Sequence, residues 1–360
     1  MATRSIYWYD RYQNSILQAT LESPANSTVF VANVTARSMA VDQLSGKLYY
    51  ADSDTGFIKM TDPSTQLTKT LMKPPLSTAA DSRINGIAHD AVNGFVYWTD
   101  SNSVLNKGQI WRMRNDGSNK EVVLSRLHWP YGITISYERR SLFFCEARLL
   151  EIQEFSWDVL NNNGTIPVAA NVYNFRQTSS RNLPFMYSIA VFENMVYFID
   201  GSQQYVERFN LTTGVSSFTQ FSSAAFYRPR SLALFSKTYY DQYIGVLQNP
   251  CARVPATCSN MCFNVNNSAV CQCPDGTHLR ASMCMANTLR TDNAPYVTSP
   301  INCPYTSVIQ LQPCQNASVF SWTEPNWADD YTATNRLRRT YPNYTSPAIF
   351  SPGSYELVFT

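Results

Sequence analysis

Few side chains in this sequence could carry out catalysis. Its three histidines, His89, His128 and His278, form no His-Glu-x-x-His pair of the kind that binds zinc. There is no Gly-x-Ser-x-Gly nucleophile elbow and no glycine-rich phosphate loop. We interpret His89 as a structural residue facing a turn, whereas His128 could sense pH because imidazole titrates near pH ~6.5. We predict no catalytic residue, metal site or cofactor, and we expect that the protein is not an enzyme.

Acidic residues recur at near-constant intervals. Each closes a pentad of aromatic and aliphatic residues, and the five pentads end at Asp10, Asp52, Asp100, Glu146 and Asp200. The steps between these acids are 42, 48, 46 and 54 residues. A carboxylate that returns once per repeat does not form a single catalytic centre. We therefore expect these acids to make hydrogen bonds between repeats.

Eight of the nine cysteines lie between Cys251 and Cys314, and the ninth is Cys145. Six of the eight are closely spaced: Cys251, Cys258, Cys262, Cys271, Cys273 and Cys284. This density predicts a disulfide framework and an oxidising compartment. A zinc site is the alternative, but there is no Cys-x-x-Cys pair and His278 is the one histidine nearby. We interpret Cys145 as a small buried hydrophobic residue, with a reactive thiol as the alternative.

Seven Asn-x-Ser/Thr sequons indicate the same compartment. They begin at Asn26, Asn33, Asn163, Asn210, Asn266, Asn316 and Asn343. Together they predict a glycoprotein of the secretory pathway, located outside the cell or at its surface. The residues after Met1 contain no apolar signal-peptide segment. We therefore expect either an artificial start or a true N-terminus that lies upstream.

Composition excludes several classes of protein. Hydrophobic residues make up 44% of the 360 residues, which is enough for a sizeable core and excludes wholesale disorder. A net charge of +2 without a basic run argues against nucleic-acid binding. No apolar stretch is long enough for a membrane helix, so we expect no direct membrane insertion.

Short strands are expected to position the recurring acids. The region before Cys251 is rich in Tyr, Phe, Val, Ile and Thr, and turn-forming Asn, Asp, Gly and Ser interrupt it at intervals. A period of about 40–50 residues built from short strands is typical of β-propeller blades. Each acidic pentad would be the second strand of a blade. The innermost strands are predicted at 37–42, 85–90, 131–136, 187–192 and 230–235. In the third copy, Asn93-Gly94 indicates a hairpin turn.

The pentad Val96-Tyr97-Trp98-Thr99-Asp100 resembles the YWTD repeat of low-density-lipoprotein-receptor class B propellers. His128-Trp129-Pro130-Tyr131-Gly132 is similar to the segment that opens the next blade in that family. The resemblance implies six blades, whereas the sequence holds five pentads. We interpret the chain as a fragment that lacks its N-terminal blade, with closure as a five-bladed ring as the alternative.

Residues 249–285 resemble the EGF-like module that follows such propellers. The resemblance implies the disulfides Cys251–Cys262, Cys258–Cys271 and Cys273–Cys284, although spacing alone leaves 15 connectivities open. No calcium is expected, because Leu247–Pro250 lacks acidic ligands. Residues 286–360 resemble part of a hyalin-repeat (HYR) domain, an immunoglobulin-like sandwich, on the basis of a Cys303-Pro304 pair and a Trp-Thr-Glu-Pro motif at 322–325. Cys303 would have lost its partner or would pair with Cys314.

The predicted fold is therefore all-β: a propeller at 1–248, the EGF-like module and an incomplete sandwich. A propeller presents a rigid ring of loops around one mouth, which suits binding. The candidate mouth residues are Arg37, Asn85, Trp129, Tyr131, Tyr187 and Arg230. Arg, Tyr and Trp are enriched at interface hot spots. We predict an extracellular receptor or matrix fragment whose partner is a protein, not a nucleic acid. A structural adhesion scaffold is the alternative, and a propeller hydrolase ranks third.

Overall fold

Five antiparallel sheets make up most of the chain before the cysteine cluster, as the repeat predicts. The first sheet has three strands and the other four have four each. The strands are β1 (Ser5–Asp10), β2 (Ser15–Thr20) and β3 (Ser23–Val31); β4 (Ala36–Val41), β5 (Leu48–Asp52), β6 (Phe57–Thr61) and β7 (Thr68–Met72); β8 (Ser82–Asp90), β9 (Phe95–Asn102), β10 (Gly108–Arg114) and β11 (Glu121–Leu127); β12 (Pro130–Ser136), β13 (Ser141–Glu146), β14 (Glu151–Ser156) and β15 (Asn171–Asn174); and β16 (Met186–Phe192), β17 (Met195–Asp200), β18 (Tyr205–Asn210) and β19 (Gly214–Ser222). The predicted all-β propeller with five blades is confirmed.

The computed structural model describes residues 5–72, 82–102, 107–160, 168–175, 186–200, 205–222, 230–252, 258, 260–280 and 283–286, together with short strands beyond residue 295. The chain divides into two units, Met1–Cys284 and Met285–Thr360. None of the helices found among these residues is long and apolar enough to cross a membrane.

The acidic pentads are the second strands β1, β5, β9, β13 and β17. All five residues of β5 are buried, since neighbouring blades cover both faces of each sheet. Hairpin turns follow an Asx pattern, in which an aspartate side chain accepts from the backbone two and three residues later. Asp90 Oδ1 accepts from Val92 N at 3.1 Å and from Asn93 N at 3.0 Å, and Gly94 has a positive φ of 69°.

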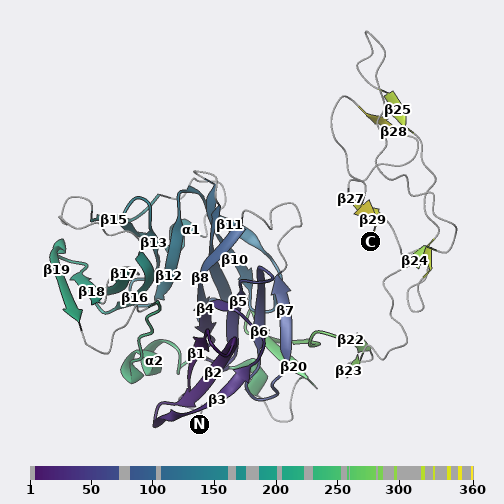
Figure 1. Ribbon diagram of the computed structural model, residues 1–360, viewed down its shortest axis with the longest axis horizontal. Coiled ribbons are helices and arrows are strands. Elements are labelled where there is room, and N and C mark those ends of the chain that lie inside the picture. The colour runs from purple at the N-terminus through teal and green to yellow at the C-terminus, as the bar shows by residue number, and fades with distance from the viewer. Residues whose placement is uncertain are drawn as a thin grey trace. The chain divides into compact units, whose positions relative to one another are not determined.

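The innermost strands β4, β8, β12 and β16 lie side by side in chain order (Figure 1). Segment 230–235 differs from its prediction, because it has no strand pairing among the described residues. It nevertheless occupies the next inner position beside β16. Leu232 N donates to Ser188 Oγ at 3.1 Å, just as Ile87 N donates to Ser38 Oγ at 2.9 Å where β8 packs on β4.

Two helices were not expected from the sequence: α1 (Trp157–Leu160) and α2 (Lys237–Tyr243). Ser236 caps α2 by accepting from Tyr239 N. The tyrosines of α2 pack against the blades, where Tyr239 Oη accepts a hydrogen bond from Tyr137 N at 2.7 Å. This helix follows segment 230–235 and is therefore attached to the blade that contains β12.

The cysteine module contains η1 (Pro250–Ala252), β20 (Met261–Val265), β21 (Ser268–Gln272), β22 (Thr277–Arg280) and β23 (Met283–Ala286). Its disulfides join Cys251 to Cys262, Cys258 to Cys271 and Cys273 to Cys284, the pairs that the resemblance implies. The module packs on the blades: Met261 and Phe263 enter the same buried cluster as Tyr49 and Trp98.

Polar contacts hold the same interface. Lys69 Nζ donates to the Cys273 carbonyl at 2.8 Å, and Thr70 N donates to Asp275 Oδ2 at 2.9 Å. Gln272 Nε2 donates to Asp116 Oδ2 at 3.1 Å. The blades and the module therefore pack as one body.

The second unit is described only in short paired strands. They are β24 (Tyr296–Val297) with β26 (Trp327–Ala328), β25 (Ser318–Phe320) with β28 (Ala348–Phe350), and β27 (Arg339–Tyr341) with β29 (Val358–Phe359). Cys303 and Cys314 lie outside the described residues, so the HYR interpretation stays a prediction.

Candidate functional site

The mouth residues predicted from the sequence share one position in the strand register. In β4, Ala36 pairs with Asp52 and Ser38 pairs with Ala51, so Arg37 is an extra, bulged residue. The same irregularity falls at Asn85 in β8, at Tyr131–Gly132 in β12 and at Tyr187 in β16. A β-bulge re-aims a side chain and is common beside functional sites. The blades therefore present equivalent side chains at the end where the pentads close.

Arg230 completes this series. Leu232 occupies the place that Ile87 has in β8, so the residue two positions earlier, Arg230, corresponds to Asn85. Three neighbours of the series are in contact: the rings of Tyr131 and Tyr187 meet edge to face at 5.5 Å, and the Arg230 guanidinium lies 4.9 Å from the centre of the Tyr187 ring. We call Arg37, Asn85, Tyr131, Tyr187 and Arg230 the bulge ring.

The members of the bulge ring differ in exposure. Arg37 and Arg230 are exposed, and both tyrosines are partly exposed. Asn85 is buried, with its Nδ2 donating to Ser101 Oγ at 2.6 Å and to the Pro130 carbonyl at 3.2 Å. Asn85 therefore joins two blades, whereas the other four side chains reach the surface. Trp129, the sixth predicted residue, precedes β12 and lies 5.7 Å from the Arg148 guanidinium.

Thr99, in the third pentad, stabilises the bulge at Asn85 through two hydrogen bonds. Thr99 Oγ1 accepts from Gly86 N at 2.8 Å and donates to the Tyr131 carbonyl of the next blade at 2.7 Å. One hydroxyl thus satisfies a backbone donor and a backbone acceptor that the irregular pairing leaves without ladder partners. This gives a physical reason for threonine at that position of the pentad.

The hydrogen bonds found for Asp10, Asp52, Asp100 and Glu146 among the described residues lie within their own sheets, which contradicts the predicted bonds between blades. Asp100 Oδ1 accepts from Arg83 N at 3.1 Å, and Glu146 Oε2 accepts from His128 N at 3.0 Å. Glu146 also accepts from Trp129 N. In both cases the N–H donor lies in the segment that leads into the innermost strand of the same sheet. This segment runs past the end of the second strand, where the acid lies. Asp100 and Glu146 therefore hold the chain that leads to the bulges of β8 and β12.

Glu146 provides a pH-dependent test of this arrangement. Burial raises the pKa of its carboxyl to about 6 from 4.5. The folded state then binds this proton more tightly than the unfolded state, so the stabilisation is present below pH 4.5 and is lost as the pH rises through about 6. The shift corresponds to roughly 2 kcal/mol. We expect Glu146→Gln to remove this loss while keeping a side-chain oxygen that can accept from the backbone.

Urea unfolding at about pH 4 and about pH 7.5 measures the effect. The free energy of unfolding of the wild type should fall by roughly 2 kcal/mol more than that of Glu146→Gln across this interval. Glu193→Gln, an exposed change in the β16–β17 turn, is the control and should follow the wild type. Parallel curves for the wild type and Glu146→Gln would contradict the assignment.

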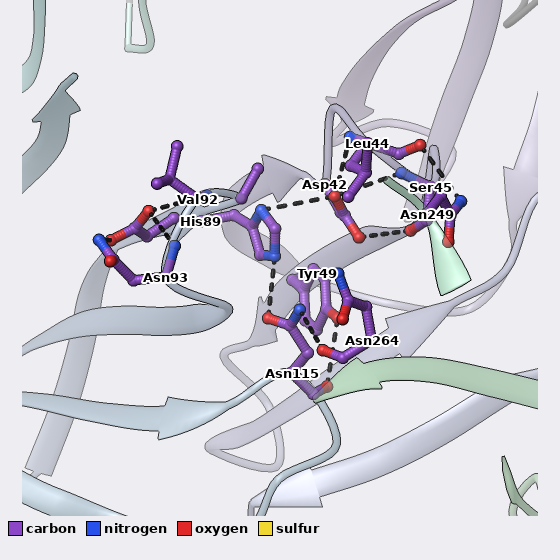
Figure 2. A network of polar contacts seen from close by, with 12 residues as sticks. Asp42, Leu44, Ser45, Tyr49, His89, Val92, Asn93, Asn115, Asn249 and Asn264 are labelled. Carbon is purple, nitrogen blue, oxygen red and sulfur yellow. Dashed lines mark hydrogen bonds and ion pairs between the residues drawn. The ribbon is translucent and has the colours of Figure 1, made fainter. Parts of the chain in front are cut away.

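His89 has a structural role, but not the predicted one facing a turn. It lies in β8, buried, and stacks on the Tyr49 ring at 5.2 Å. Its Nε2 lies 3.0 Å from Asn115 Oδ1, and Asn115 Nδ2 donates to the Asn264 carbonyl of the cysteine module at 3.0 Å (Figure 2). Since Asn115 presents its oxygen to the imidazole, Nε2 must be the donor. His89 thus helps to join two blades to the module.

The remaining candidates fall in several environments. His128 is partly exposed, Cys145 is buried and free, and the side chain of His278 lies outside the described residues. Burial raises the pKa of the Cys145 thiol, which does not favour a reactive thiolate. Asn26, Asn33 and Asn266 are exposed and Asn210 is partly exposed, while Asn163, Asn316 and Asn343 lie outside the described residues. Within the described part, no three His, Cys, Asp or Glu side chains could together hold a metal ion.

Sequence reasoning missed two arginines at the mouth, Arg83 and Arg148. Arg83 is exposed at the start of β8, and its own backbone N–H is the one that Asp100 accepts. Its position two residues before Asn85 could have identified it. Arg148 follows β13, in a loop that the inner-strand pattern does not cover.

Comparison with known proteins supports the propeller and adds a family. A family model described as SMP-30/gluconolactonase/LRE-like region matches residues 1–182. The vitellogenin receptor Yl of Drosophila melanogaster is 24% identical over 194 residues, which make up 52% of this chain and 8% of that receptor. The chain thus spans only a small part of the length of this relative.

Solved structures share the fold at low identity. A chain of a nidogen/laminin complex aligns with a TM-score of 0.52 and 19% identity, covering 64% of this chain and 80% of that one. A luciferin-regenerating enzyme aligns with a TM-score of 0.50 and 10% identity, covering 64% and 76%.

The expectation that the protein is not an enzyme is wrong in the light of the family match. The family description names gluconolactonase, and the luciferin-regenerating enzyme has the same fold. The catalytic residues of a propeller need not lie together in a short motif. A propeller instead brings together residues from separate blades, here 42 to 54 positions apart, so a site at its axis leaves no compact motif.

Proposed function

The chain belongs to the SMP-30/gluconolactonase/LRE-like region family, and on this propeller we propose that the bulge ring binds a ligand at the mouth. The observation that carries the proposal is the shared register position of Arg37, Tyr131 and Tyr187, which Arg230 matches through the hydrogen bond of Leu232 N to Ser188 Oγ. Four blades and segment 230–235 each direct one residue of the ring to the same end of the molecule. Arginine and tyrosine are the residue types that most often dominate binding energy.

We propose a protein as the ligand and a lipoprotein-receptor-like protein as the source of the chain. The similarity to a receptor and to a chain of a nidogen/laminin complex supports this class. Three disulfides support an extracellular or cell-surface location. In this proposal the cysteine module is EGF-like and the unit after it is a partial HYR domain. A scaffold without a ligand site is the alternative.

Peptide selection tests the proposal. Phage-displayed peptides retained by the full chain are remeasured on Tyr187→Ala and on Arg230→Ala. Each variant should lose roughly 2 kcal/mol or more of binding free energy, because truncating a central hot spot has that cost. Arg140→Ala is the matched control: its side chain is 67% exposed and lies in the β12–β13 turn, at the opposite end of the blade.

The melting temperature of each variant separates binding from folding. If selected peptides bind all four proteins equally, the mouth is not the site and the scaffold alternative gains support. If binding and melting temperature fall together, Tyr187 and Arg230 only hold the blades in place.

Hydrolysis of a small lactone is the second candidate function, and the family match over half of the chain favours it. The test is release of acid from δ-gluconolactone, followed with a pH indicator in weak buffer, with and without added divalent cations. The expected result is a rate that scales with protein concentration and disappears on heating. A rate equal to that of buffer under every condition would exclude this substrate.

A further inference from the structure

Three arginines at the mouth carry positive charge that the described residues do not neutralise. Arg37, Arg83 and Arg230 are exposed, and no carboxylate among the described residues forms an ion pair with them. They come from three different positions around the series of inner strands. The whole chain has a net charge of only +2. These three arginines therefore place positive charge at the mouth.

Three described acids at the same end bind other groups. Glu146 is fully buried and accepts from His128 N and Trp129 N. Asp100 accepts from the backbone of Arg83, and Asp52 Oδ2 pairs with Lys59 Nζ at 2.8 Å. Because these carboxylates bind groups within their own sheets, they leave the arginine side chains to face the solvent. A ligand can then supply the opposite charge.

Contacts with a neighbouring aromatic ring also hold the Arg230 side chain in place. Its guanidinium lies over the Tyr187 ring at 4.9 Å, and Tyr187 is braced by Tyr131 at 5.5 Å. Stacking orders the guanidinium without using its N–H donors, and the planar group can give two parallel hydrogen bonds to a carboxylate. The tyrosine rings beside it offer apolar surface to the residues that flank such a carboxylate.

We propose that the mouth selects a peptide segment of its partner that presents Asp or Glu to Arg230 and Arg37, with an apolar neighbour against Tyr131 and Tyr187. This rests on the proposed binding function and names the chemistry of its ligand. A sulfated polysaccharide would also be anionic. The observations favour a peptide, because two tyrosine rings lie between Arg83 and Arg230 in the series and no basic run longer than two residues exists in the sequence.

The test uses a fluorescein-labelled peptide, Gly-Ser-Glu-Glu-Leu-Glu-Glu-Ser-Gly, and the same peptide with Gln at each Glu. Binding to the full chain is measured by fluorescence polarisation at low and high salt. The Glu peptide should bind at least about ten-fold more tightly than the Gln peptide at low salt, and this difference should shrink as salt rises. Arg230→Gln and Arg37→Gln should each weaken the Glu peptide about three- to ten-fold and leave the Gln peptide unchanged. Arg140→Gln should change neither.

Each other outcome has a defined meaning. Equal binding of the two peptides, lost in Tyr187→Ala, overturns the acidic preference and leaves the proposed binding function intact. Binding of neither peptide, with heparin bound through Arg37 and Arg230, overturns the peptide in favour of a sulfated polysaccharide. Equal losses in Arg140→Gln and Arg230→Gln show a general charge effect and also overturn the proposal.

Discussion

Replacing Phe263 with alanine is expected to lower the free energy of unfolding of the blade-and-module unit by about 3–5 kcal/mol. The ring is only 1% exposed and lies in one cluster with Tyr49, Trp98 and Met113 from two blades. Phe263 itself belongs to the cysteine module. Its removal therefore leaves a cavity between the module and the propeller, and nearby side chains can fill such a cavity only in part.

Urea unfolding measures this loss, with Phe235→Ala as the matched control. Phe235 is 62% exposed, so the same truncation there should change stability by less than about 0.5 kcal/mol. A loss below about 1 kcal/mol for Phe263→Ala would mean that the module is stabilised by its disulfides and hardly at all by the propeller. An intermediate with a folded propeller and a detached module would support the same conclusion.

The sequence predicted the propeller well because its signal is repeated. Each pentad must bury aromatic residues on both faces of a sheet, and that requirement recurs in every blade whatever the loops contain. For the same reason, the inner strands predicted at 131–136 and 187–192 begin one residue after the starts of β12 and β16. The strand predicted at 85–90 begins three residues after the start of β8. The candidate mouth residues were predicted from the starts of these strands.

Other features depend on contacts that a pattern does not encode. The bulge at Arg37 comes from strand pairing, and the pairing of Asp100 and Glu146 with their own sheets depends on how the chain enters each inner strand. Docking of Phe263 could not be predicted either, since residues near the end of the unit meet residues more than 140 positions earlier. A family relationship with enzymes was also hidden, because no short motif carries it.

Gly132→Ala is the second large effect that we expect, at about 3 kcal/mol of lost stability. A Cβ at residue 132 would lie 2.8 Å from Ser188 Cα and 2.9 Å from the Tyr187 carbonyl oxygen. Both are backbone atoms of the next inner strand, so no flexible side chain can move aside. The two strands must separate, and separation pulls Tyr187 away from Tyr131. We therefore expect peptide binding at the mouth to weaken together with stability.

Ser188→Ala is the control. It separates the effect of the close approach between the two strands from the effect of the size of the side chain. Residues Ser38, Gly86, Gly132 and Ser188 share the register position beside each bulge, and Ser188 already has a Cβ at this place. Its truncation removes the hydrogen bond from Leu232 N and should cost only about 1 kcal/mol. Similar losses for Gly132→Ala and Ser188→Ala would show that the strands can adjust to a methyl group. The spacing between β12 and β16 would then not fix the tyrosine pair, and the bulge ring would owe its geometry to the strand pairing within each blade alone.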